Sequence, residues 1–135
     1  MKRSVVKAAV VGLSMLCATA MVQAQGNVEY GKREYQSNCA ACHGTEGRGN
    51  GPYNMFMTQK SVPDLAVLAR NSDGGFPYQR VQQMIDGREQ SELGETRDMP
   101  IWGARYASVP TYNPELYAAL RIAALIEYVE QLQVK

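Results

Sequence analysis

The clearest hydrophobic pattern in the chain lies near its C-terminus, where apolar residues recur every three or four positions. These residues are Ala118, Ile122, Leu125, Val129 and Leu132. The spacing gathers them on one face of an amphipathic helix. Asn113 is a suitable N-cap for such a helix, and Pro114 fits its first turn. The pattern therefore predicts a long last helix that begins at Pro114.

Two more helices are predicted upstream. Asn27 can cap a helix over about residues 28–40. Pro77 fits the first turn of a helix that runs to Asp86, and Gly87 is a typical stop signal. The apolar stripe of that second helix consists of Val81, Met84 and Ile85. We therefore expect Met84 to pack in the core.

The segments between these helices are rich in turn-forming residues. A loop is marked by Gly44, Gly47, Gly49, Gly51 and Pro52. Residues 53–59 are predicted to form a short helical turn, and residues 62–65 a turn that leads into a short helix ending near Arg70. Residues 88–112 show no sustained period and are predicted to form a long surface strap. The chain is thus predicted to be a small all-α domain of three main helices, and loops of this length normally wrap around something.

The N-terminal segment has the composition of a secretory signal peptide. Three lysine and arginine residues precede an apolar run over residues 8–21, which ends in Val22-Gln23-Ala24. We expect cleavage after Ala24, which makes residues 1–24 a signal peptide and residues 25–135 the mature domain, located in the periplasm. A retained membrane anchor is the alternative, although the uninterrupted apolar run is short for a transmembrane helix.

Charge and composition exclude some classes of partner. Removal of residues 1–24 takes away three of the 14 Lys and Arg residues and none of the 13 Asp and Glu residues, which leaves a net charge of −2. The chain has no basic run interleaved with aromatic residues, so we expect no nucleic-acid partner. No second apolar segment is long enough to span a bilayer, so we expect no membrane span after signal cleavage.

Residues 39–43 carry the chemistry. Cys39, Ala40, Ala41, Cys42 and His43 form a C-x-x-C-H motif, the attachment signature of c-type haem. Two thiols at this spacing can reach the two vinyl groups of one porphyrin, and the adjacent imidazole can reach its iron. We therefore expect one haem c, attached covalently through Cys39 and Cys42, with its iron bound by His43.

Other uses of the two cysteines fit the sequence less well. A disulfide between them would close a tiny loop and constrain little of the unfolded chain. A thioredoxin-like pair lies at a helix start after a buried strand, whereas this pair lies at the end of a predicted helix. A zinc site needs about four ligands, and His43 is the only histidine in the chain.

The second axial ligand of the iron cannot be another histidine of this chain. The methionines outside the signal segment are Met55, Met57, Met84 and Met99. We favour Met99, because it lies in the irregular strap beside the stiffening Pro100, and a strap can cross the far side of a haem. Met57 and an open or different ligand are the alternatives. A His/Met ligand pair favours reduced iron and raises its reduction potential.

Two further residues are candidates for the haem site. Trp102 either packs on the haem edge and donates its N–H to a propionate, or fills the core. The imidazole N–H of His43 needs an acceptor that fixes the ring. The backbone carbonyl of Pro63 is the first candidate for that acceptor, and Pro52 marks the second.

Several segments together resemble a bacterial class I c-type cytochrome. They are the attachment motif, the glycine-rich run to Pro52, Val62-Pro63-Asp64-Leu65, Asp98-Met99-Pro100 and Leu125-Ile126-Glu127-Tyr128-Val129. The resemblance covers residues 25–135. It implies the all-α class I cytochrome c fold, with three main helices and long loops wrapped round one haem.

The resemblance also implies roles for individual residues. Gly31 and Tyr35 match the positions at which the first helix crosses the last one, near Leu125 and Tyr128. Met99 matches the distal ligand of the family. The carbonyl beside Pro63 matches the acceptor for the proximal histidine.

A haem with both axial positions filled has no open site for a substrate. The sequence therefore predicts an electron carrier and not an enzyme. The expected partners are redox proteins of the periplasm or membrane: a donor dehydrogenase or cytochrome complex, and an acceptor oxidase or reductase. The protein is expected to be a monomer or one subunit of a heteromer. The alternatives are the cytochrome subunit of a periplasmic dehydrogenase and a haem-based ligand sensor with open iron.

Overall fold

The computed structural model describes residues 27–57, 62–73, 75–88 and 98–134. The predicted signal peptide, residues 1–24, lies outside these ranges. The secondary structure of the described residues is helical and includes no strand, as the hydrophobic pattern predicts. None of the described helices is long and apolar enough to cross a membrane.

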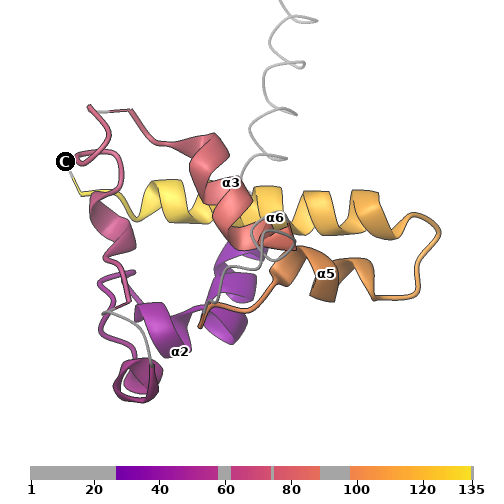
Figure 1. The fold of residues 1–135 in the computed structure, drawn as a ribbon. Coiled ribbons are helices and arrows are strands. Elements are labelled where there is room, and N and C mark those ends of the chain that lie inside the picture. The colour runs from indigo at the N-terminus through magenta and orange to yellow at the C-terminus, as the bar shows by residue number, and fades with distance from the viewer. Residues whose placement is uncertain (1–26, 58–61, 74, 89–97, 135) are drawn as a thin grey trace, which may run out of the picture.

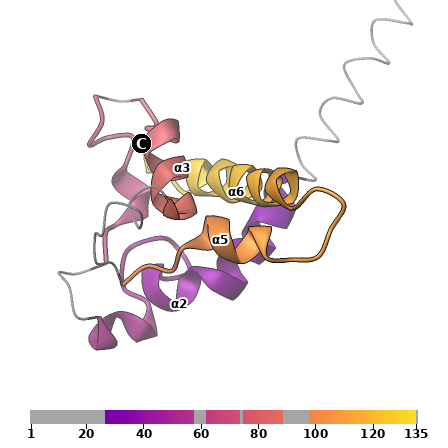
Figure 2. The same cartoon turned by 45° about the vertical axis from the view of Figure 1, so that its right-hand side comes forward.

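The helical elements pack against one long helix. A first helix covers residues 27–38. It is followed by α2 (Ala40–His43), the 3-10 helices η1 (Pro52–Phe56) and η2 (Leu65–Val67), then α3 (Tyr78–Asp86), α5 (Trp102–Ala107) and α6 (Pro114–Gln131). Figures 1 and 2 show that α6 crosses the molecule and that α3 and α5 pack beside it, while α2 and η1 lie together at one end.

Helix α6 begins where the sequence predicts. The side chain of Asn113 accepts a hydrogen bond from the N–H of Leu116 at 3.0 Å, and Pro114 occupies the first turn. The predicted apolar face is buried, with Leu132 at its partly buried end. Further buried residues of this helix are Ala124, Ile126 and Tyr128. Helix α6 is thus covered on more than one face and forms the centre of the core.

The first helix crosses α6 at Gly31. A Cβ atom placed on Gly31 would lie 1.9 Å from the carbonyl oxygen of Ala124. Only a residue without a side chain allows two helix backbones to come this close. Beside the crossing, the rings of Tyr35 and Tyr128 pack with their centroids 5.2 Å apart. The crossing implied by the family resemblance is therefore present.

Helix α3 ends at the predicted stop. Gly87 adopts a left-handed conformation with φ 69°, and its N–H donates to the carbonyl oxygen of Gln83 at 2.9 Å. Pro77 precedes the first helical residue as the N-cap and does not form part of the first turn.

The interior of α3 corrects one prediction. Val81 and Ile85 are buried, but Met84 is 45% exposed. Val81 and Ile85 are four positions apart and so define the buried stripe, and Met84 lies at its edge, 100° of helix away from Ile85. The prediction that Met84 packs in the core is therefore wrong.

Helix α5 was not predicted. The sequence predicts an irregular strap over residues 88–112, of which residues 89–97 lie outside the described ranges, but residues 102–107 are helical. Trp102 and Tyr106 are one helical turn apart, and both are buried, with ring centroids 5.6 Å apart. A helix of this length contains too few apolar positions to show a sustained period, so its stability comes from packing on α6 and α3.

Candidate functional site

The C-x-x-C-H motif lies where the first helix passes into α2. The N–H of Cys39 donates to the carbonyl oxygen of Tyr35 at 2.8 Å, and the N–H of His43 donates to that of Cys39 at 2.9 Å. The chain therefore keeps a nearly helical path from Tyr35 to His43. Cys39 and Cys42 are three positions apart on this path, which places them on one face.

The glycine-rich loop folds back onto the end of α2. The last carbonyls of a helix lack partners within the helix. Here the N–H of Gly49 donates to the carbonyl oxygen of His43 at 2.8 Å, and the N–H of Gly51 donates to that of Cys42 at 3.1 Å. Gly49 has a φ of +71°, and a Cβ atom there would lie 2.3 Å from the carbonyl oxygen of Val62. The loop thus holds Val62 and the following proline against α2.

The segment after Pro63 is also anchored from the C-terminal end of the chain. The side chain of Gln133 donates to the carbonyl oxygen of Leu65 at 2.7 Å, and the N–H of Val134 donates to that of Ala66 at 2.9 Å. Figure 1 shows the end of the chain beside this segment. Pro63 is therefore held between the glycine loop and the end of α6.

The side chain of His43 is buried and contacts a backbone carbonyl. Its Nδ1 lies 3.4 Å from the carbonyl oxygen of Pro63. Because a carbonyl oxygen can only accept, Nδ1 carries the proton and Nε2 keeps a free electron pair. Burial lowers the pKa of His43 and outweighs the opposing effect of the Pro63 carbonyl. The imidazole is therefore neutral near pH 7 and is able to bind a metal.

Cys39 and Cys42 are free, partly buried thiols. Burial, followed by the nearby charges of Glu34 and Cys42, raises the pKa of Cys39 to about 12. The Cys39 sulfur is therefore protonated near neutral pH. A protonated thiol attacks disulfides poorly, so Cys39 does not have the activated thiolate of a disulfide oxidoreductase.

Two cavities meet beside the motif. Their volumes are about 220 Å³ and about 400 Å³. Five residues line both of them: Cys39, His43, Pro63, Met84 and Met99. The larger cavity is otherwise walled largely by core side chains, and its volume lies within the range of about 300–1,000 Å³ typical of ligand sites.

The structure separates the candidate methionines. Met99 lines both cavities. Met84, which the sequence pattern predicts to pack in the core, also lines both of them. Met57 lines the smaller cavity only. Met55 is 80% exposed and lines neither cavity. Three methionines thus contribute to the same site as His43.

Trp102 belongs both to the core and to the site. It is buried, packs on Tyr106, and lines the smaller cavity together with Cys42. The guanidinium of Arg105 lies 5.1 Å from the centroid of its ring. Trp102 therefore fills the core and also lines the cavity, while its contact with a haem edge and its hydrogen bond to a propionate stay predictions.

A buried ion pair next to the site was missed by the sequence reasoning. Glu34 of the first helix is 9% exposed and pairs with Arg121 of α6. Tyr106 and Asn38 also donate to the Glu34 carboxylate, each at 3.2 Å. Glu34 and Arg121 are 87 positions apart in the sequence. They are too far apart for any short-range sequence pattern to pair them. The only sign of this pair in the sequence is a glutamate on the buried face of a predicted helix.

The residues present fit an iron porphyrin. Two cysteines on one face, a neutral imidazole and three methionines all line the smaller cavity, whose wall is largely apolar. Imidazole nitrogen and thioether sulfur are both established ligands of haem iron. The described residues contain no group of three or more His, Cys, Asp and Glu side chains that would hold a bare metal ion. The imidazole, the methionines and the two thiols are together the groups that a covalently attached haem requires.

Comparison with known proteins agrees with this chemistry. A family model described as cytochrome c matches residues 28–133. Neither the curated proteins nor the solved structures gave a match. Members of the matched family bind covalently attached haem c with its iron and are haem-based electron-transfer proteins. The helical structure of the described residues is that of the class I fold predicted from the sequence. Because the matched range covers most of the chain, this protein belongs to the cytochrome c family.

Proposed function

We propose that this protein carries single electrons between redox proteins of the periplasm or membrane. The haem is attached through Cys39 and Cys42, and His43 and Met99 are the axial ligands of its iron. When bound, the haem supplies a one-electron Fe(III)/Fe(II) couple. The observation that carries the proposal is the smaller cavity, whose lining brings together both cysteines, the His43 imidazole and Met99.

The chain's own residues have distinct roles in this proposal. The carbonyl of Pro63 holds the His43 ring in the tautomer that leaves Nε2 available. Val81, Ile85 and Leu125 line the larger cavity and keep water from its inner wall. Pro63 and Trp102 also form walls of the smaller cavity. A dry, rigid surrounding lowers the reorganisation that accompanies a change of charge at the site.

The proposal excludes catalysis by this chain alone. The chain has one histidine, and it is assigned to the iron. With a second ligand from Met99, no position on the iron is left for a substrate. Contacts with electron donors and acceptors are then short-lived and small in area. The composition of residues 1–24 supports export to the periplasm.

The axial ligand is tested by three matched methionine variants: Met99→Ala, Met84→Ala and Met57→Ala. Each variant removes one sulfur that lines the site. Oxidised wild-type protein is expected to show the weak far-red absorption band that arises from sulfur bound to ferric iron. We expect Met99→Ala alone to lose this band and to bind carbon monoxide readily when reduced.

Attachment is measured on the same samples by haem staining after denaturing electrophoresis. The wild type and all three methionine variants are expected to retain stain, while Cys39→Ala with Cys42→Ala loses it. Persistence of the far-red band in Met99→Ala, or its loss in Met84→Ala, would show that the ligand assignment is wrong. Unstained wild-type protein would reject the attachment itself.

A further inference from the structure

The buried carboxylate of Glu34 lies one residue away from the wall of the cavity. Asn38 lines the smaller cavity together with Cys39 and Cys42. The amide nitrogen of Asn38 donates to Oε2 of Glu34 at 3.2 Å. Glu34 itself lines neither cavity. A single hydrogen-bonded side chain therefore separates this carboxylate from the site.

The compensating positive charge lies one step further away. Arg121 donates to Oε1 of Glu34 and lines neither cavity. Its guanidinium lies over three tyrosine rings, with the centroid of Tyr106 at 4.6 Å, that of Tyr117 at 5.2 Å and that of Tyr30 at 5.8 Å. The order from the site outwards is Asn38, Glu34, Arg121, so the negative end of the ion pair is the nearer one.

The carboxylate lies close to the attachment residues, because Asn38, which donates to it, directly precedes Cys39 in the chain and lines the same cavity. Glu34 is 9% exposed, so little water screens its charge. At an effective dielectric constant of about 20, a charge in such a place acts over several ångströms with the strength of a typical hydrogen bond.

We infer that Glu34 is a potential-setting residue, whose carboxylate lowers the reduction potential of the haem, and that Arg121 limits this effect. The inference rests on the proposed attachment of the haem at Cys39 and Cys42. Oxidised iron carries one more positive charge than reduced iron. A nearby negative charge therefore stabilises the oxidised form, and the farther positive charge of Arg121 offsets only part of that stabilisation.

Glu34→Gln is the principal test. Glutamine keeps the shape of the side chain and still accepts hydrogen bonds from Tyr106 and Asn38, but it removes the negative charge. We expect the ratio of reduced to oxidised haem at a fixed applied potential to rise by up to about tenfold. For a one-electron couple, a tenfold change in this ratio corresponds to a rise of about 59 mV in the reduction potential. The measurement is spectroelectrochemical titration of protein that has been shown to carry attached haem.

Glu29→Gln is the matched control. Glu29 lies on the same helix, loses the same charge, and is exposed. Water and salt screen its field, so we expect the potential of this variant to equal that of the wild type. The comparison separates the effect of a buried charge near the site from the effect of net charge.

Tyr106→Phe provides a test with the opposite sign. It removes the hydroxyl that donates to Oε2 of Glu34 at 3.2 Å, but keeps the ring beside Trp102. Without this hydrogen bond the negative charge of Glu34 is less dispersed, so we expect the reduction potential of the haem to fall. The size of this fall should be smaller than that of the rise in Glu34→Gln. This variant retains the ion pair, and it leaves the cavity lining unchanged because Tyr106 lines neither cavity. A fall in its potential therefore does not come from a loosened cavity, and the variant is the deciding measurement if Glu34→Gln does not fold.

A purely structural role for Glu34 predicts a different result. A loosened cavity admits water, which solvates the oxidised form and lowers the potential. A fall in Glu34→Gln, or a potential equal to that of Glu29→Gln, would overturn the inference, as would an unchanged potential in Tyr106→Phe. Absence of attached haem from the wild type would instead reject the proposed function, so the two failures are distinguishable.

Discussion

Gly31 shows how a single missing side chain permits the central contact of the fold. The first helix and α6 meet where the backbone of residue 31 lies against the carbonyl of Ala124. Glycine within a helix costs about 0.5–1 kcal/mol relative to alanine. The close approach of the two helices, with Tyr35 and Tyr128 packed beside it, offsets that cost.

We therefore expect Gly31→Ala to destabilise the protein, although alanine is the better helix former. Its methyl group would lie 1.9 Å from a backbone oxygen that cannot rotate away. Overpacking of this kind costs about 1–3 kcal/mol, and backbone contact places this site at the upper end of the range. The measurement is urea unfolding of the haem-containing protein followed by circular dichroism.

Gly75→Ala is the control for this substitution. Gly75 is exposed, and the nearest atom to an added Cβ is the carbonyl oxygen of Ser72 at 3.9 Å. The free energy of unfolding should change by less than about 1 kcal/mol. If Gly31→Ala were as stable as Gly75→Ala, the close crossing would not exist in solution.

Individual residues also show where sequence reasoning reaches its limit. The assignment of Met84 to the core followed from the period of α3, but the period places it only at the edge of the buried stripe. Glu34 was not identified at all, because its partner Arg121 comes from a distant helix. The spacing of residues predicts which of them share one face of a helix. Which other element packs against that face depends on the tertiary structure.

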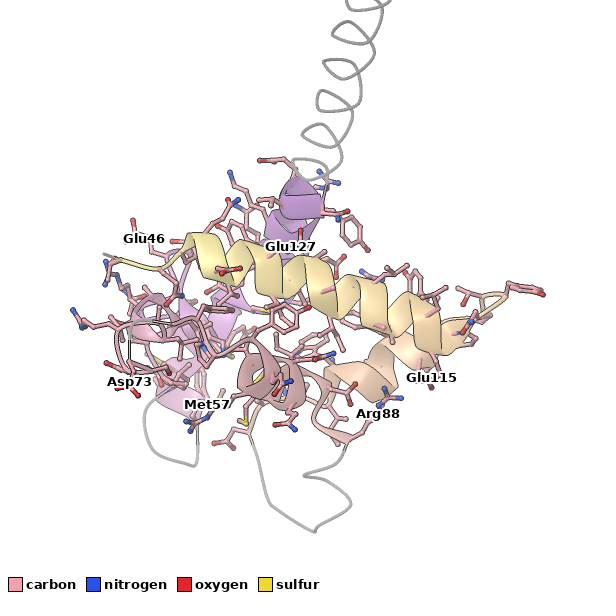
Figure 3. The ribbon with its side chains drawn as sticks, turned by 90° about the horizontal axis from the view of Figure 1, so that it is seen from above. Glu46, Met57, Asp73, Arg88, Glu115 and Glu127 are labelled. Atoms are coloured by element: carbon pink, nitrogen blue, oxygen red, sulfur yellow. The ribbon has the colours of Figure 1, made fainter. Side chains whose placement is uncertain are left out.

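At the scale of elements, Arg88 connects the end of α3 to the beginning of α6. Its Nε and Nη2 donate to the Asp86 carboxylate at 2.8 Å and 2.9 Å, and its Nη1 donates to Glu115 at 2.7 Å. Figure 3 shows Arg88 and Glu115 side by side at the first turn of α6. These contacts hold the last residue of α3 against the helix that forms the core.

The Asp86 contact predicts a pH dependence of stability. Hydrogen bonds from Arg88 lower the pKa of Asp86 below its usual value, against the opposing effect of burial. A carboxylate with a lowered pKa contributes stability above its unfolded pKa of about 3.9, and this contribution is lost as the pH falls through the folded value. We expect Asp86→Asn to be less stable than the wild type at pH 7 by about 0.5–1 kcal/mol, since the pair is partly exposed.

The difference between wild type and Asp86→Asn should shrink as the pH falls below about 4, because the wild type then loses the same charge. Urea unfolding at several pH values measures this difference. Asp73→Asn, at an exposed turn, is the control and should stay within about 0.5 kcal/mol of the wild type at each pH. A difference for Asp86→Asn that does not depend on pH would contradict the electrostatic explanation.

The elements differ in how well the sequence predicts them. Helix α6 has a cap, a first-turn proline and a repeated apolar face, and its start is placed correctly. Helix α3 has a glycine stop, and its end is placed correctly. Helix α5 has six residues and little intrinsic stability, so only its contacts with α6 and α3 make it helical.

At the scale of the whole molecule, the cavity and the core share their walls. Five residues that belong to the buried core also line the larger cavity: Tyr35, Val81, Ile85, Leu125 and Val129. The core is therefore arranged around the site and is incomplete without what fills it. The sequence indicated this arrangement through loops that are long for a domain of this size.

We therefore expect the chain without haem to lose its cooperative fold. The larger cavity, of about 400 Å³, is lined by these five core side chains, so removal of its occupant exposes them to water and takes away the apolar contacts that they would make. The variant Cys39→Ser with Cys42→Ser, prepared free of haem, should show no sharp transition in differential scanning calorimetry. A cooperative transition close to that of the haem-containing protein would contradict this prediction.

The crossing of the first and last helices also has a consequence for the order of events during folding. Glu34 and Arg121 are 87 positions apart, and the closing of so long a loop is entropically costly and slow. The attachment motif belongs to the early part of the chain, while its inner wall includes residues of the last helix. Until that helix arrives, Cys39 and Cys42 belong to an open chain whose thiols are accessible from all sides. The two thiols are thus accessible for haem attachment until the first and last helices pack together.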